Sequence, residues 1–153
     1  MRINDQFTMT TEYHAKLQFD GGSRGNPGIS GAGAVLYHDD REIWSGSFFV
    51  GENETNNYAE YAGLIAGLQQ AVDLHITHLL VEGDSLLVVN QLRGLYKCRS
   101  PNLIEMYAQA KQLETHFASV SYAHVLRRRN KRADELANNA MDQYVKDMSL
   151  ICP

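Results

Sequence analysis

The order in which strand-like and helix-like segments follow one another constrains the fold of this chain most strongly. The expected strands cover residues 14–19, 31–38, 42–50, 77–83 and 119–126, and the expected helices cover residues 55–73, 84–94, 100–117 and 131–146. The resulting order βββαβααβα predicts an α/β fold with one five-stranded mixed sheet. We expect the first three strands to be antiparallel, the last two to be parallel, and helices to cover both faces.

A length of 153 residues suits one domain with a single core. We expect this domain to span residues 14–147, after an N-terminal extension over residues 1–13 and before a tail over residues 148–153. No signal-peptide core and no apolar run near the ~20 residues of a membrane span is present in the sequence. We therefore expect a cytoplasmic protein without membrane association, and a monomer. Whether Cys98 and Cys152 pair is left open.

Charge gives a mixed signal about nucleic acid. The net charge of −4 argues against a nucleic-acid partner, but residues 127–132, "RRRNKR", place five positive charges in six positions. Taken alone, such a run is most simply a solvated surface loop. The residues around it decide between the two interpretations.

Four acidic residues stand at positions that matter for chemistry. Asp20 ends the first expected strand, Asp84 follows the fourth, and Asp134 lies in the first turn of the last helix. Each has an ordinary structural explanation, as a turn residue, a helix cap or a helix N-terminal acid. Glu60 is harder to explain in this way, because small and apolar residues surround it on its helix. A poorly solvated carboxylate needs a partner, and a metal ion is a suitable one.

The predicted sheet brings these acids together. If the first and fourth strands are adjacent and parallel, Asp20 and Asp84 emerge at the same edge, where open α/β sheets place ligands. Clusters with only oxygen ligands suit hard cations such as Mg²⁺. Two Mg²⁺ ions, with Mn²⁺ as a substitute, would activate a water and stabilise the leaving oxygen in phosphodiester cleavage.

Four motifs carry a resemblance to a known family: "FDGGSRGNPG" at 19–28, "TNNYAE" at 55–60, "VEGDS" at 81–85 and "RADELAN" at 132–138. In this order and spacing they resemble type 1 ribonuclease H, over about residues 14–145. The resemblance implies Mg²⁺-dependent hydrolysis of the RNA strand of RNA/DNA hybrids, which leaves 5′-phosphate and 3′-hydroxyl ends. It also implies that the catalytic, metal-binding acids are Asp20, Glu60, Asp84 and Asp134, with Asp20 bridging both ions.

The resemblance also suggests how the hybrid is held. Backbone groups of the glycine-rich segment would approach the minor groove and its ribose 2′-hydroxyls, which distinguish RNA from DNA. An asparagine pair would read the same groove, and two hydroxyl side chains would hold a DNA-strand phosphate. In this order the implied contacts are Gly21, Gly22, Arg24 and Asn26, then Asn56 and Asn57, then Thr55 and Ser100. The basic run would add phosphate contacts through Arg128, Arg129 and Lys131.

Two features depart from many family members. The loop before the last helix lacks the histidine that assists proton transfer or product release, and Arg127 resembles the arginine that replaces it in an archaeal-type subgroup. We expect His124 to lie on the preceding strand, with a structural role. The basic protrusion is also absent, because residues 93–102, "RGLYKCRSPN", are too short for it. Some relatives without the histidine cut double-stranded RNA, so this second substrate is left open.

Other functions fit the sequence less well. A non-catalytic module that binds hybrids or double-stranded RNA would lose some of the acids, yet all four are present. Another nuclease of the superfamily, such as a resolvase or an integrase, would share the acids but not the glycine-rich segment and the asparagine pair. A nucleotide-phosphate loop would end in Gly-Lys-Ser/Thr and precede a helix, which this segment does not.

Overall fold

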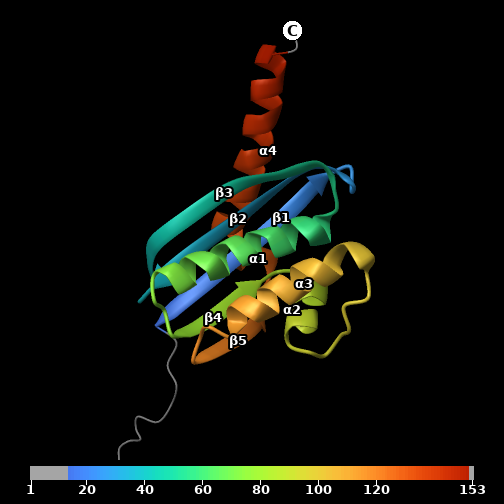
Figure 1. Cartoon of the computed structure of the whole chain (residues 1–153). Helices are drawn as coiled ribbons and strands as arrows, with labels where there is room; N and C mark the ends of the chain where they lie inside the picture. Colours follow the sequence, from blue (N-terminus) through green and yellow to red (C-terminus); the bar gives the residue numbers. More distant parts are fainter. Residues whose placement is uncertain (1–13, 152–153) are drawn as a thin grey trace, which may run out of the picture.

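One mixed sheet organises the computed structural model, which describes residues 14–151 (Figure 1). The strand order is β3-β2-β1-β4-β5, with β1 (Ala15–Arg24), β2 (Gly28–His38), β3 (Arg41–Glu54), β4 (His78–Gly83) and β5 (Ser119–His124). β1, β2 and β3 pair antiparallel, whereas β4 pairs parallel with both β1 and β5. The predicted fold class is confirmed. The expected extension over residues 1–13 lies outside the described residues, as does Cys152.

Helices cover both faces of this sheet, as the sequence predicted (Figure 1). On one face α1 packs against β1, β2 and α3, and on the other α4 packs against β1, β2 and β3. The helices are α1 (Asn56–Asp73), α2 (Leu86–Leu92), α3 (Pro101–Glu114) and α4 (Lys131–Ile151), with a 3₁₀ turn, η2 (Arg127–Arg129), before α4. Among the helices described, we find no candidate for a membrane span.

The main core lies between the sheet and α1. Leu17 and Phe19 of β1 are fully buried, and so are Leu64 and Leu68 of α1 and Val81 of β4. These positions follow the period of two expected for a strand and the helical period of α1, so the same side chains that define the elements also join them. Burial on this scale fixes the register of β1, and with it the place of Asp20.

The prediction that Asp20 ends the first strand is wrong. Pairing of β1 with β4 stops at Phe19 and Gly83, but pairing with β2 continues from Asp20 opposite Gly33 to Arg24 opposite Ile29. The glycine-rich segment is therefore mostly strand, and the turn is confined to residues 25–27. Glycine scores poorly as a strand former, but here a long partner strand outweighs that preference.

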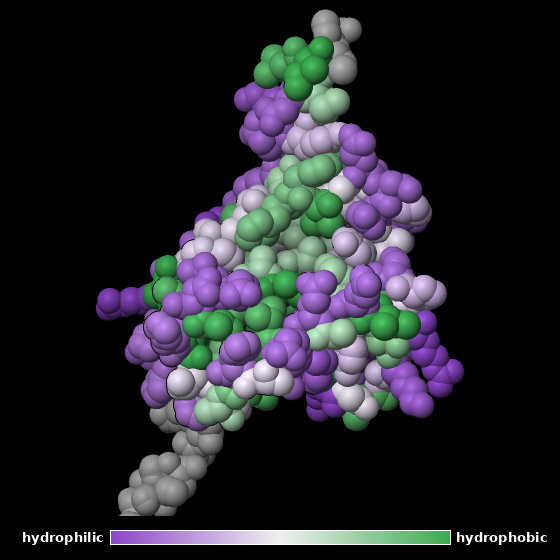
Figure 2. Space-filling model, in the orientation of Figure 1, coloured by the Kyte–Doolittle hydropathy of each residue, from purple (hydrophilic) through white to green (hydrophobic). Residues whose placement is uncertain are grey.

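Several other boundaries also differ from the prediction. β3 continues to Glu54, α3 ends at Glu114, and β5 ends at His124 before the η2 turn. The last helix runs to Ile151 instead of residue 146, because residues 147–151 contain neither glycine nor proline to end it. Its final turns project beyond the sheet (Figure 1) and stand out from the rest of the surface (Figure 2).

Candidate active site

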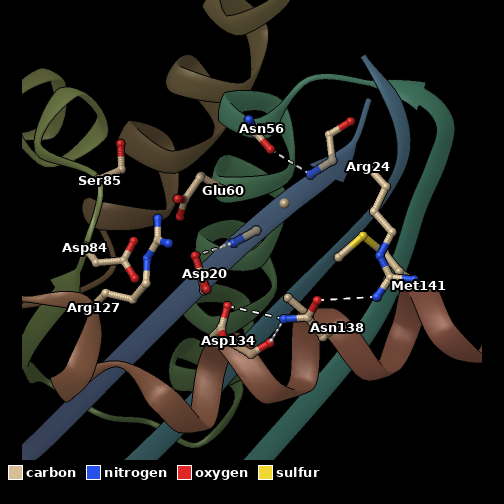
Figure 3. A pocket seen from close by; sticks show the side chains of 14 residues that line it. Asp20, Arg24, Asn56, Glu60, Asp84, Ser85, Arg127, Asp134, Asn138 and Met141 are labelled. Carbon is tan, nitrogen blue, oxygen red and sulfur yellow. Dashed lines mark hydrogen bonds between the residues drawn. The ribbon is translucent and has the colours of Figure 1, made fainter. Parts of the chain in front are cut away.

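The four acids named from the sequence line one cavity of about 420 Å³ (Figure 3). Carboxylate oxygens of Asp20, Glu60 and Asp84 all lie within 4.8 Å of one another. Asp134 approaches Asp20 from α4, close enough for a hydrogen bond between the two side chains. The structure thus places together the residues that the sequence analysis brought to one sheet edge.

The unequal pairing of β1 explains how acids from both faces of the sheet can meet. Beyond Phe19 and Gly83, no strand among residues 14–151 pairs with β1 on the β4 side. Glu60 reaches this gap from α1 on one face, and Asp134 reaches it from the first turn of α4 on the other. Asp84 enters from the turn between β4 and α2. The gap is therefore a meeting point for four separate elements.

Two glycines allow α1 to lie directly on β1 at this point. A Cβ atom added to Gly21 would stand 2.2 Å from the backbone carbon of Ala59, and one added to Gly63 would stand 2.8 Å from the carbonyl oxygen of Asp20. Neither contact is sterically allowed, so any larger residue would push the helix away. The glycine at position 21 therefore sets the distance between Glu60 and Asp20.

Burial and mutual repulsion raise the pKa values of Asp20 and Glu60, so these carboxyls are weaker acids than usual. Burial, and then the charge of Asp84 and a hydrogen bond that protonated Asp20 donates to Asp134, raise the pKa of Asp20 to about 8. Burial and the charges of Asp20 and Asp84 raise the pKa of Glu60 well above its usual value. The Oε1 atom of Glu60 is buried and has no hydrogen-bond partner within the described part of the chain. A cation would stabilise such a cluster, and the all-oxygen donor set fits a hard divalent ion.

Arg127 lies in η2 and lines the same cavity, where its charge lowers the pKa of Glu60 against the larger effects that raise it (Figure 3). His124 is the exposed last residue of β5, as expected, and does not line the cavity. Its Nε2 atom lies 3.2 Å from the carbonyl oxygen of Asp84. Of these two residues, only Arg127 faces the carboxylates.

Sequence reasoning missed Asn130, which is fully buried behind the acids. Its Nδ2 donates to the Phe19 carbonyl oxygen at 2.9 Å and to Asp84 Oδ2 at 3.3 Å. Gln18, also buried, donates to the Arg129 carbonyl oxygen at 3.1 Å. These contacts fix the η2 turn against β1. Asn130 could have been noticed in the sequence, because it is the single uncharged residue within the basic run and stands directly before a helix.

The expected hybrid contacts fall into two groups. Gly21, Gly22, Arg24 and Asn56 line the cavity. The Asn56 amide donates to Asn26 Oδ1 at 2.9 Å, and Asn56 Oδ1 accepts from the Ser23 amide at 2.7 Å, which ties the β1–β2 turn to α1 (Figure 3). Arg24 donates to Asp142 Oδ1 at 2.7 Å.

The second group lies outside the cavity. Thr55 caps α1 by accepting from the Tyr58 amide, Asn57 lies in the first turn of α1, and Ser100 precedes α3. Arg128, Arg129 and Lys131 are exposed on and after η2. The cavity is also lined by residues that the sequence analysis did not single out: Ser23, Ser85, Ala137, Asn138 and Met141. Asn138 donates to the Asp134 carboxylate at 3.3 Å, so it supports a member of the cluster.

Comparison with known proteins agrees with this geometry. Residues 18–140 match the family described as reverse transcriptase-like. The bifunctional protein Rv2228c of Mycobacterium tuberculosis is 47% identical over 127 residues, which are 82% of this chain and 35% of that protein. The solved N-terminal RNase H domain of Rv2228c is similar with a TM-score of 0.84 and 43% identity, covering 90% of this chain and 99% of that one. Ribonuclease HI of Halobacterium salinarum is 44% identical over 81% of this chain and 62% of its own length. This chain belongs to the type 1 ribonuclease H family.

A third family member adds a ligand-bound structure. LC11-RNase H1, isolated from compost by a metagenomic approach, has been solved in complex with an RNA/DNA hybrid. It is similar to this chain with a TM-score of 0.81 and 34% identity, over 86% of this chain and 99% of its own. The chain spans 35% of the length of the mycobacterial relative, so the likeness to Rv2228c concerns its ribonuclease H part.

Proposed function

We propose that this chain is a metal-dependent endonuclease that hydrolyses the RNA strand of RNA/DNA hybrids and leaves 5′-phosphate and 3′-hydroxyl ends. The observation that carries the proposal is the convergence of Asp20, Glu60 and Asp84 within 4.8 Å, with Asp134 beside them. Membership of the ribonuclease H family and the hybrid complex of LC11-RNase H1 support the choice of substrate.

Two divalent cations would be held by Asp20, Glu60, Asp84 and Asp134, with Mg²⁺ as the expected ion and Mn²⁺ as a substitute. The residues fit this group, since the donors are all oxygen and Glu60 Oε1 is buried without a partner. Bound there, the ions would supply Lewis acidity for attack of water and departure of the ribose 3′-oxygen. Asp20 would be the ligand that also contacts acids from both faces of the sheet.

Arg127 would donate hydrogen bonds to the phosphate that is cut. Arginine acts in proteins as a charged hydrogen-bond donor, so this residue would stabilise charge and would not act as a general base. It lines the cavity beside Glu60, which supports contact with a phosphate that enters the cavity. In the archaeal-type subgroup that this loop resembles, an arginine takes the place of the histidine.

Recognition of the hybrid would combine groove contacts with phosphate contacts. Ribose 2′-hydroxyls identify the RNA strand, and backbone groups of Gly21 and Gly22 face the cavity without intervening side chains. The remaining groove contacts would be Arg24, Asn26, Asn56 and Asn57. Phosphates would be held by Thr55, Ser100, Arg128, Arg129 and Lys131. Since Arg24 pairs with Asp142 in this structure, hybrid binding would exchange that partner for the substrate.

We further propose that residues 14–147 act as the catalytic domain, as a monomer in the cytoplasm, with side activity on double-stranded RNA. The missing loop histidine supports that side activity, because some relatives without this histidine cut double-stranded RNA.

The test is a cleavage assay on end-labelled hybrid, double-stranded RNA and double-stranded DNA, with Mg²⁺, with Mn²⁺ and with chelator. We expect internal cuts in the RNA strand of the hybrid with Mg²⁺ and with Mn²⁺, and no cuts with chelator. The Asp84→Asn variant should make no cuts with either ion. A hybrid that is bound but left intact would indicate a non-catalytic module. Cleavage of double-stranded DNA would indicate another nuclease of the superfamily.

A further inference from the structure

Four of the six histidines in the chain gather at the end of the sheet away from the acids. His14 precedes β1, His38 ends β2, His75 follows α1 and His78 begins β4, and together they line one groove of about 540 Å³. Asp20 lies six residues beyond His14 along the chain, so about 20 Å of strand separates this groove from the acids. The groove is therefore distinct from the candidate active site.

At the edge of this groove, two imidazoles face one carboxylate. His14 Nδ1 lies 2.9 Å from Asp39 Oδ1, and His38 Nδ1 lies 3.5 Å from Asp39 Oδ2. The Asp39 amide also donates to the His14 carbonyl oxygen at 2.9 Å, which holds the turn between β2 and β3 against the start of β1. Two nitrogen donors and one carboxylate thus come from two separate parts of the chain.

We propose that His14, His38 and Asp39 bind one divalent transition-metal ion of the zinc class. Imidazole and carboxylate are ligands that Zn²⁺ accepts, whereas Mg²⁺ prefers oxygen alone. With bonds of about 2.0–2.1 Å, two ligand atoms of a tetrahedral zinc ion lie about 3.4 Å apart. The nitrogen-to-oxygen separations, 2.9 Å to Asp39 Oδ1 and 3.5 Å to Asp39 Oδ2, place one imidazole beside each oxygen of this carboxylate.

The remaining adjustment lies between the two rings. Their centroids are 6.5 Å apart, whereas two imidazoles on one tetrahedral zinc ion have centroids about 5 Å apart. The side chains of His14, His38 and Asp39 are 61%, 57% and 60% exposed, so they can rotate without disturbing the core. The nearby cation Lys16 already pairs with Glu82, at 3.7 Å. An ion bound here would tie the residue before β1 to the β2–β3 turn.

Zinc binding tests this site independently of nuclease activity. Titration calorimetry would use the full chain carrying Asp20→Asn and Asp84→Asn, stripped with chelator, so that the oxygen cluster no longer competes for metal. We expect one equivalent of Zn²⁺ to bind, and His14→Ala, His38→Ala or Asp39→Asn to weaken it more than about tenfold, since each removes a ligand. Asparagine tolerates the left-handed backbone of Asp39, at φ 49°, so this variant keeps the turn. His116→Ala, at another exposed histidine, is the matched control and should bind Zn²⁺ like the parent.

Nitrogen-15 spectra of the imidazoles supply the second measurement. Zinc should shift the Nδ1 signals of His14 and His38 and leave those of His116 in place. Unchanged affinity in the His14→Ala/His38→Ala double variant would overturn the proposal. So would a loss of affinity caused by His75→Ala or His78→Ala instead, because the donors would then be the other pair of histidines in the groove.

Discussion

At the scale of single residues, Asp20 is a carboxyl whose ionisation is opposed both by burial and by nearby acids. It is 7% exposed, and burial, the charge of Asp84 and a hydrogen bond to Asp134 raise its pKa in the folded protein to about 8 from 3.8. A carboxyl whose pKa is raised by folding stabilises the folded state fully below its unfolded pKa. That contribution is lost as the pH rises through the folded pKa. The metal-free protein should therefore lose stability between about pH 4 and pH 8.

Asp20→Asn separates catalysis from stability. We expect less than about a tenth of the parent cleavage rate with Mg²⁺, because an amide is a poor ligand for a hard cation. In chelator, the variant should exceed the parent in free energy of unfolding by several kcal/mol at pH 9, where the parent must ionise Asp20, and by much less at pH 5, because each pKa unit corresponds to about 1.4 kcal/mol. Urea denaturation at both pH values measures this. Asp73→Asn, at an exposed acid, is the control. Its difference from the parent in free energy of unfolding should be small at both pH values.

Replacing Arg127 and replacing His124 should affect the cleavage rate very differently. Arg127→Ala should lower single-turnover cleavage of a hybrid by about 10–100-fold, which is the effect of one electrostatic contact at a reacting phosphate. His124→Ala should leave the rate nearly unchanged, because its ring lies outside the cavity. The rate between pH 6 and 9 should show no break near the usual histidine pKa of about 6.5. A larger loss from His124→Ala than from Arg127→Ala, at equal folded fraction, would assign the helper role to the histidine.

At the scale of elements, the contact of α1 with β1 sets the site. Gly21→Ala would place a Cβ atom 2.2 Å from the Ala59 backbone, so α1 must shift and carry Glu60 with it. We expect a loss of about 1–3 kcal/mol in the free energy of unfolding, together with weaker Mg²⁺ binding. Gly22→Ala is the matched control, since its nearest contact would be a side-chain atom of Met141 at 3.6 Å. Equal stability of the two variants would contradict this account.

Local pattern predicted the elements well, because helical and strand periods in the sequence reflect which face is buried. It failed where a partner strand decided the outcome: β1 continues through glycines because β2 pairs with it as far as Arg24. Asp84 and Asp134 were predictable from their positions after a strand and at the start of a helix, and Glu60 from the small and apolar residues around it on α1; Asp20 was placed at the right edge although its strand continues to Arg24. Asn130 was not, since its role depends on the Phe19 carbonyl and on Asp84, both distant in sequence.

At the scale of the whole molecule, a net charge of −4 must be reconciled with a polyanionic substrate. Arg132 of the basic run is already paired with Glu42 and Glu135. Arg128, Arg129 and Lys131 are exposed, and no ion pair of theirs is found within the described chain. They can therefore add local positive charge beside an acidic cavity.

Replacing Arg128, Arg129 and Lys131 with alanine should weaken hybrid binding and flatten its salt dependence. Removal of one phosphate interaction should reduce the slope of log K against log salt concentration by about 0.9. Fluorescence anisotropy with a labelled hybrid at several salt concentrations, in Ca²⁺ to prevent cleavage, gives the slope. Arg132→Ala is the control and should keep the parent slope. If the triple variant also keeps it, these residues are only a solvated surface.

The unequal pairing of β1 has a consequence for solubility. Beyond Phe19 the strand has an open edge, and open edges recruit strands from other chains. Here side chains occupy the outward-facing backbone groups: Asn130 on the Phe19 carbonyl, Asp20 on the Gly21 amide and Asn56 on the Ser23 amide. The residues around the cavity thus also shield a potential aggregation site, so a change at Asn56 would expose a bare amide to neighbouring molecules.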